Sequence, residues 1–190
     1  MTKFGWAWRA VRARRDEQGA TIVEAAIIIP LLILLTFGAI EFGIGFRDSA
    51  AVAGATRSGA RIASAMTGQT DFANYTQLSV SDSLKDLLHA DPISLTIYKA
   101  DANGNPLGSF DSCTDCFTYT WNAGSKTWSG PAGDPWTVAE QKSMVCGNTL
   151  PAVGVRVLAK QSFITGLFGG GKNFDHKTVM RLEPISTDQC

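Results

Sequence analysis

The chain has 190 residues, of which 45% are hydrophobic, and its 17 basic residues balance its 17 acidic ones. This length has room for one membrane segment and one compact domain of roughly 100–120 residues. The zero net charge, and a basic cluster that is short and confined to the N-terminus, argue against a nucleic-acid-binding protein.

Residues 1–19 form a basic leader. Against two acidic residues, the leader carries five basic ones: Lys3, Arg9, Arg12, Arg14 and Arg15. From residue 47 to the end, twelve basic residues face thirteen acidic ones, so that part is nearly neutral. Short basic flanks of a membrane helix stay in the cytoplasm. We therefore expect a cytoplasmic leader, with the residues after about 46 outside.

Residues 20–66 are predicted to form one continuous transmembrane and stalk helix. Sixteen consecutive residues, 25–40, carry no charge. With their milder flanks they reach the roughly 20 residues needed to cross a hydrocarbon core of ~30 Å. The Ala-rich stretch 47–66 contains no proline and has good helix propensity. Pro30 removes one backbone donor, and we expect either a bend used in leaving the bilayer or an ordinary tolerated kink.

The outer half of this helix carries small residues at four-residue spacing: Ala51, Ala55, Gly59 and Ala63. This spacing places them along one stripe, where small side chains let another helix approach closely. Two uses remain open at this point. Either another subunit packs against the stripe, or the stripe packs against the chain's own domain.

Residues 67–190 are predicted to form a small extracytoplasmic domain. The spacing of leucines and polar residues predicts an amphipathic helix over 75–89, and the stretch 122–136 is predicted to be loop. Strands are predicted over four segments: 93–98, 116–121, 152–161 and 174–183. A long helix, a short helix and then several strands are typical of an α+β fold, here with an antiparallel sheet.

All four cysteines fall in this domain: Cys113, Cys116, Cys146 and Cys190. An even number in an oxidising compartment favours structural disulfides, and four cysteines allow three connectivities. A zinc site is disfavoured because His89 and His176 are far from the cysteines in sequence. A redox site is disfavoured because the Cys-x-x-Cys motif leads into a predicted strand rather than a helix. We expect no metal and no cofactor.

The segment Gly19-Ala20-Thr21-Ile22-Val23-Glu24 resembles the processing site of type IV prepilins. The wider pattern through Pro30 to Gly43, with 55–61 and 179–183, resembles TadE-like proteins, which are minor pilins or pseudopilins of tight-adherence (Flp) pili. The resemblance implies cleavage by a prepilin peptidase between Gly19 and Ala20. It makes Glu24 the fifth residue of the mature chain.

The chemistry of the motif is compatible with this resemblance. Cleavage would free an α-amino group on Ala20, whose pKa of about 7.7–8.0 leaves it largely protonated at neutral pH. Glu24 lies one helical turn away, and its carboxylate can pair with that amine or with the amine of a neighbouring subunit. Such a pair would set the stagger between helices, because an unpaired buried charge is strongly penalised. The alternative is an uncut, hydrated Glu24 at the headgroup level.

These observations predict a non-enzymatic structural pilin, anchored by a single span in the bacterial cytoplasmic membrane and able to enter an extracellular pilus. Its expected partners are other pilin and minor pilin subunits, the prepilin peptidase, the inner-membrane assembly platform and membrane lipid, with no nucleic acid. One alternative is a secreted or tethered disulfide-bonded binding domain, with Ala51-Val52-Ala53 as a signal-peptidase site. An enzyme is disfavoured because no nucleophile–base pairing is visible.

Overall fold

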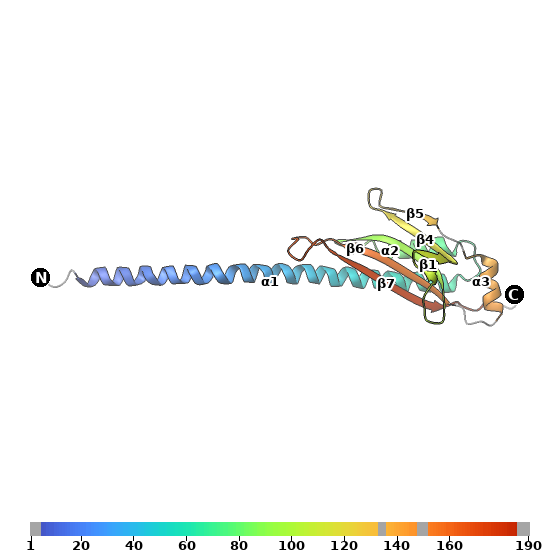
Figure 1. Cartoon of the computed structure of the whole chain (residues 1–190), viewed down its shortest axis with the longest axis horizontal. Coiled ribbons are helices and arrows are strands. Elements are labelled where there is room, and N and C mark those ends of the chain that lie inside the picture. Colours follow the sequence, from blue (N-terminus) through green and yellow to red (C-terminus); the bar gives the residue numbers. More distant parts are fainter. Residues whose placement is uncertain (1–4, 133–135, 148–151, 186–190) are drawn as a thin grey trace. The chain divides into compact units, whose positions relative to one another are not determined.

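The computed structural model describes residues 5–132, 136–147 and 152–185, without the side chains of residues 5–18 and of Thr114 (Figure 1). The chain divides into two compact units, Met1–Gly43 and Ile44–Cys190. Each unit is described by itself.

The first unit is helical. Its described residues belong to α1, Gly5–Ala65, which is long and apolar enough to cross a membrane, with a mean hydropathy of 2.4 over its most apolar window. The prediction started this helix at residue 20, whereas the structure extends it back through the leader to Gly5. The leader contains no proline, and its three Ala and four Arg residues favour a helix, so nothing in it ends one. The predicted end at 66 lies one residue beyond Ala65.

The second unit is an α+β domain, which confirms the predicted fold class. Its five-stranded antiparallel sheet has the order β5-β4-β1-β6-β7. These strands are β1 Ala90–Ala100, β4 Cys116–Asn122, β5 Thr127–Ala132, β6 Ala152–Gln161 and β7 Lys172–Arg181. A two-stranded sheet pairs β2 Leu107–Ser109 with β3 Ser112–Thr114. The helices besides α1 are α2 Phe72–Ser83 and α3 Val138–Cys146.

The core lies between the sheet and the second half of α1, with α2 beside them. The cross-strand pair Ile97 and Val155 is fully buried, and Val155 lies against Gly59 of α1. Val80 of α2 belongs to the same cluster. One face of α1 after residue 44, which includes Val52, Ala55 and Gly59, is therefore part of the domain core.

Several boundaries differ from the sequence prediction. The second helix runs from Phe72 to Ser83 rather than over 75–89, because the chain turns after Leu84 and hydrogen-bonds back to α1 before β1 begins. The predicted loop 122–136 contains strand β5. The side chain of Asn122 accepts hydrogen bonds from the amides of Gly124 and Ser125, so the polar residues form the turn of a hairpin. The short elements α3, β2 and β3 were not predicted.

Candidate functional site

The predicted processing site lies within α1. Gly19, Ala20 and Glu24 are exposed in the first unit. Ala20 and Glu24 are four residues apart on a continuous helix, so they share one face. An amine at Ala20 would therefore start on the same side of the helix as the Glu24 carboxylate. Cleavage after Gly19 stays a prediction.

Pro30 lies inside α1, and the helix continues on both sides of it. Around Pro30, large apolar side chains are exposed on every face of the helix. They include Ile27 (70% exposed), Ile29 (52%), Leu31 (59%), Leu32 (55%) and Leu35 (58%). A helix that is apolar all round requires lipid or other protein around it.

The small-residue stripe packs within the second unit. Ala55, Gly59 and Ala63 are buried, and Ala51 is half-buried. A Cβ atom placed on Gly59 would lie 2.5 Å from Val80 Cγ2 and 3.2 Å from Val155 Cγ1. Of the two uses left open by the sequence, the structure shows the intramolecular one for this stripe.

Polar side chains also tie α1 to the rest of the unit. The buried carboxylate of Asp48 accepts hydrogen bonds from the backbone amides of Leu88 (3.0 Å) and His89 (2.9 Å). Further along α1, the Thr56 hydroxyl lies 2.9 Å from the hydroxyl of Thr178 on β7. Sequence reasoning missed these contacts. The sequence signal for Asp48 was an acidic residue, like Glu41 seven residues before it, inside a helix face that otherwise consists mostly of apolar and small residues.

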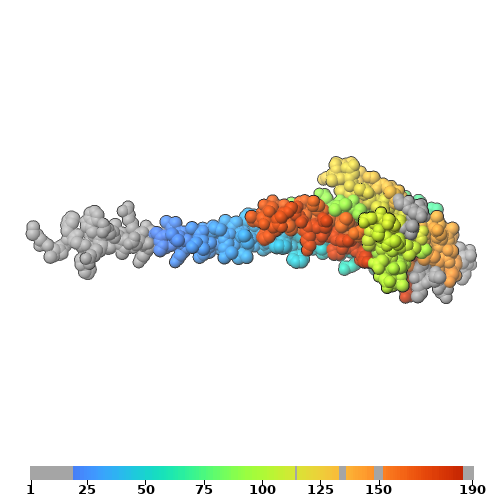
Figure 2. Space-filling model, viewed as in Figure 1, coloured from blue at the N-terminus to red at the C-terminus, as the bar shows by residue number. Residues whose placement is uncertain are grey.

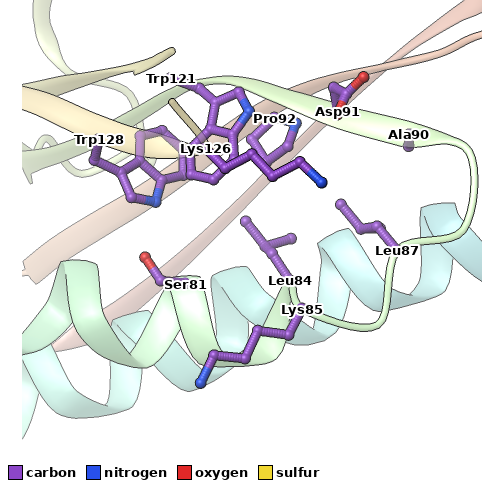
Figure 3. Close-up of a pocket in the computed structure, with 10 residues that line it drawn as sticks. All are labelled: Ser81, Leu84, Lys85, Leu87, Ala90, Asp91, Pro92, Trp121, Lys126 and Trp128. Atoms are coloured by element: carbon purple, nitrogen blue, oxygen red, sulfur yellow. The ribbon is translucent and has the colours of Figure 1, made fainter. Parts of the chain in front are cut away.

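A pocket of about 390 Å³ lies between the end of α2 and strands β1, β4 and β5 (Figure 3). Trp121 and Trp128 form one side, with ring centroids 5.1 Å apart, and Leu84 points toward them from the α2 side. Both indole Nε1 atoms are buried without a hydrogen-bond partner among the described residues. The pocket also includes Lys126, which extends between the tryptophans and Leu87.

Three of the four cysteines lie among the described residues, and all three are disulfide-bonded. Cys113 of β3 and Cys116 of β4 form a disulfide. Between them, the Asp115 carboxylate forms an ion pair with Lys99 at 3.2 Å. Cys146 is also disulfide-bonded, and Cys190 lies outside the described residues. Within the described parts of the chain, no cluster of three or more His, Cys, Asp or Glu side chains is arranged to hold a metal.

The face of the sheet opposite α1 carries an ion pair. Arg156 of β6 donates two hydrogen bonds of 2.7 Å to the carboxylate of Asp175 on β7, and its guanidinium lies 4.1 Å from the ring centre of Phe110. The guanidinium lowers the pKa of Asp175 from its usual value. Beside them, burial raises the pKa of Tyr98 to about 12. These groups attach the β2–β3 connection to the sheet.

Comparison with known proteins places one segment in a family. Residues 19–61 match the family model described as TadE-like protein, which confirms the resemblance predicted for this part of the sequence. The match begins at Gly19, includes Glu24 and Pro30, and ends within the part of α1 that packs in the second unit. No curated protein and no solved structure matches the chain. The family points to a structural protein associated with a Tad pilus.

Proposed function

Because residues 19–61 match the TadE-like family, we propose that this chain is a structural minor pilin or pseudopilin of a tight-adherence (Flp type IV) pilus. The precursor is inserted in the membrane, processed after Gly19 and assembled through its N-terminal helix. One observation carries the proposal: the matched segment begins with the part of α1, residues 22–46, in which large apolar side chains are exposed around the helix.

The exposed helix supports assembly with other subunits. In the precursor, lipid covers the apolar side chains between Ala20 and Phe46. In a fibre, the same side chains would pack against the helices of neighbouring pilins and minor pilins. Transfer from one environment to the other exchanges one apolar surrounding for another, so little hydrophobic free energy is lost.

Glu24 supplies a charged contact at the start of the apolar helix. After cleavage, its carboxylate neutralises the ammonium group of Ala20 or that of an adjacent subunit. A charge left alone in this surrounding would be strongly unfavourable, so the pairing fixes the axial position of one helix against the next.

The proposed location is the bacterial cytoplasmic membrane, with incorporation into the extracellular pilus as a later step. The five basic residues of the leader support a cytoplasmic N-terminus, which is also where the prepilin peptidase cuts. The α+β unit then lies outside, where disulfides such as Cys113–Cys116 persist.

Mass spectrometry of the non-reduced protein from membranes tests the proposal. Expression with a prepilin peptidase should give a product that begins at Ala20 and has 171 residues, with its cysteines oxidised. The variant G19A should remain a precursor. G43A is the matched control, because Gly43 is in the same helix and no described atom lies within 4 Å of the methyl group that it would gain. An intact Met1 in the native protein, or a start beyond residue 46, contradicts the proposal.

A second candidate function rests on the tryptophan pocket. The indole N–H groups of Trp121 and Trp128 have no hydrogen-bond partner among the described residues. A membrane-tethered binding domain outside any pilus would use the pocket lined by Trp121, Trp128 and Leu84 to hold a ligand with an apolar surface. Absence of the protein from purified pili, together with normal pilus formation after its deletion, would favour this candidate.

A further inference from the structure

The connection between β6 and β7, residues 162–171, exposes apolar side chains at its tip. Ile164 is 55% exposed, Leu167 is 58% exposed and Phe168 is 37% exposed. We call these three residues the apolar tip. In Figure 2 the atoms of this connection, in orange-red, lie on the surface. Exposed apolar side chains that lie together mark a contact with a partner or a membrane.

Two contacts between β6 and α1 fix the direction in which this connection extends. Val155 of β6 lies against Gly59 of α1, and Gln161 at the end of β6 lies against Gly45. The two elements therefore run antiparallel: six residues of strand cover about 20 Å while fourteen residues of helix cover about 21 Å. Residues after 161 continue toward the end of the domain at which α1 enters it, at Ile44.

Other apolar side chains are exposed at this same end. Phe46 is 76% exposed and belongs to the last part of the apolar run in α1. Leu88 is 50% exposed, and its backbone amide donates a hydrogen bond to the carboxylate of Asp48. Asp48 follows Phe46 in α1 by less than one helical turn, so Leu88 also lies at this end of the domain. Exposed apolar side chains from three separate segments therefore lie at the end of the domain where α1 enters it.

Three exposed basic side chains lie at the same end of the domain. Lys160 and Lys172 lie on the two strands that lead into the connection, where Gln161 pairs with Lys172, and both lysines are exposed. Arg47 is exposed beside Phe46. Asp91 lies opposite Lys160 on β1, so one of the three positive charges has an acidic neighbour. Long basic side chains at the border of an apolar surface are typical of contact with lipid phosphates.

We propose that the β6–β7 connection inserts its apolar tip into the interfacial layer of the bilayer that α1 crosses, on the extracytoplasmic side. This inference rests on the membrane insertion of α1 in the proposed function. Lipid is favoured over a protein partner because the apolar tip and Phe46 of α1 are exposed at the same end of the domain, together with three exposed basic residues. The domain then has two contacts with the membrane, which fix its rotation about the axis of α1.

Spin-label accessibility in the full-length chain tests this inference. The variant L167C carries a nitroxide at the apolar tip, while the native cysteines stay oxidised; the unsubstituted chain controls for their labelling. The protein is reconstituted in vesicles of phosphatidylethanolamine and phosphatidylglycerol. We expect the label at 167 to be accessible to oxygen, which dissolves in lipid, and severalfold less accessible to a water-soluble nickel chelate than the label in S125C. Ser125 is the matched control because it lies at the exposed β4–β5 turn.

Further variants separate the possible outcomes. A label in L34C, within the apolar part of α1, reports whether the helix is in the bilayer at all. If the label at 34 is protected from nickel and the label at 167 is not, the inference is wrong while the membrane insertion of α1 stands. If the label at 167 is shielded from both oxygen and nickel, a protein covers the tip and the inference is also wrong. The charge reversals K160E and K172E should raise nickel accessibility at 167 if lipid phosphates hold the tip.

Discussion

Gly59 of α1 lies so close to Val80 of α2 that a Cβ atom on Gly59 would be 2.5 Å from Val80 Cγ2. Val155 of β6 restricts the same space from the sheet side, at 3.2 Å. The absence of a side chain at position 59 thus determines how closely the long helix approaches both layers of the domain.

The variant G59A should destabilise the domain. The added methyl group overlaps two buried branched side chains, and such overpacking typically costs about 1–3 kcal/mol. G54A is the matched control in the same helix, because no described atom lies within 4 Å of its new methyl group. That variant should stabilise by about 0.4–1 kcal/mol through the lower entropy of the unfolded chain. Denaturant unfolding of the full chain in detergent, followed by tryptophan fluorescence, measures both; equal effects would contradict the packing described.

The variant E24Q should block assembly and leave cleavage after Gly19 intact. The amide has the shape of the carboxylate but no charge to neutralise the Ala20 ammonium group. E24D keeps the charge and should retain assembly in part. The measurements are the mass of the membrane-bound protein and its co-purification with other pilins. Normal co-purification of E24Q would show that the charge pair is not the contact that positions the helix.

Tyr98 should ionise at unusually high pH. Burial raises its pKa to about 12 from 10.0, because the phenolate would lose its hydration. The folded state therefore holds this proton more tightly than the unfolded state. Its contribution to stability is complete below pH 10 and is lost as the pH rises through about 12. Ultraviolet absorbance of the phenolate measures the titration.

In that titration, Y98F should lack the last step. It should also destabilise the domain by about 0.5–1.5 kcal/mol at neutral pH, because the Tyr98 hydroxyl donates a hydrogen bond to the carbonyl of Gly104. If the step at high pH persists in Y98F, that step belongs to another tyrosine.

Asp175 should make the domain sensitive to acid. Hydrogen bonding to Arg156 lowers the pKa of Asp175 below its usual value of 3.8. The stabilisation is present above that value and is lost as the pH falls through the lower pKa of the folded state. Unfolding free energies of the native chain and D175N should differ at neutral pH and converge in acid. R156K is the second comparison, because lysine keeps the charge but lacks the two-pronged hydrogen bond and the contact with Phe110. A difference in unfolding free energy between the native chain and D175N that does not change with pH would show that the Asp175 charge is not the source of the stabilisation.

The sequence predicted the longest and most periodic elements well. The predicted strand 152–161 coincides with β6, because alternating valines are fixed by the buried face of the sheet. The end of α1 was also close, because Gly68 adopts a φ of 78° that favours glycine and follows the last helical turn. The resemblance at Gly19 to Glu24 was local in sequence and needed no tertiary information.

The contacts of the domain depend on tertiary structure and were harder to predict. Nothing local shows that Asp48 reaches the amides of Leu88 and His89, forty residues away along the chain. The stripe of small residues could pack against another subunit or against its own domain, and the two cases look the same in sequence. Only the positions of α2 and β6 in the fold show that the packing is intramolecular. Strand β5 was missed because its Gly130-Pro131 pair and exposed residues resemble a loop when read alone.

The burial of Val52 shows what cleavage after Ala53 would do to the folded domain. Val52 is fully buried in the core, and Asp48 and Thr56 on either side of it hold the α2–β1 connection and β7. A signal peptidase that cut after Ala53 would carry away Asp48 and Val52 and leave the sheet partly uncovered. The anchor and the folded domain therefore share one indispensable segment, so proteolysis there would yield an unfolded fragment instead of a secreted protein.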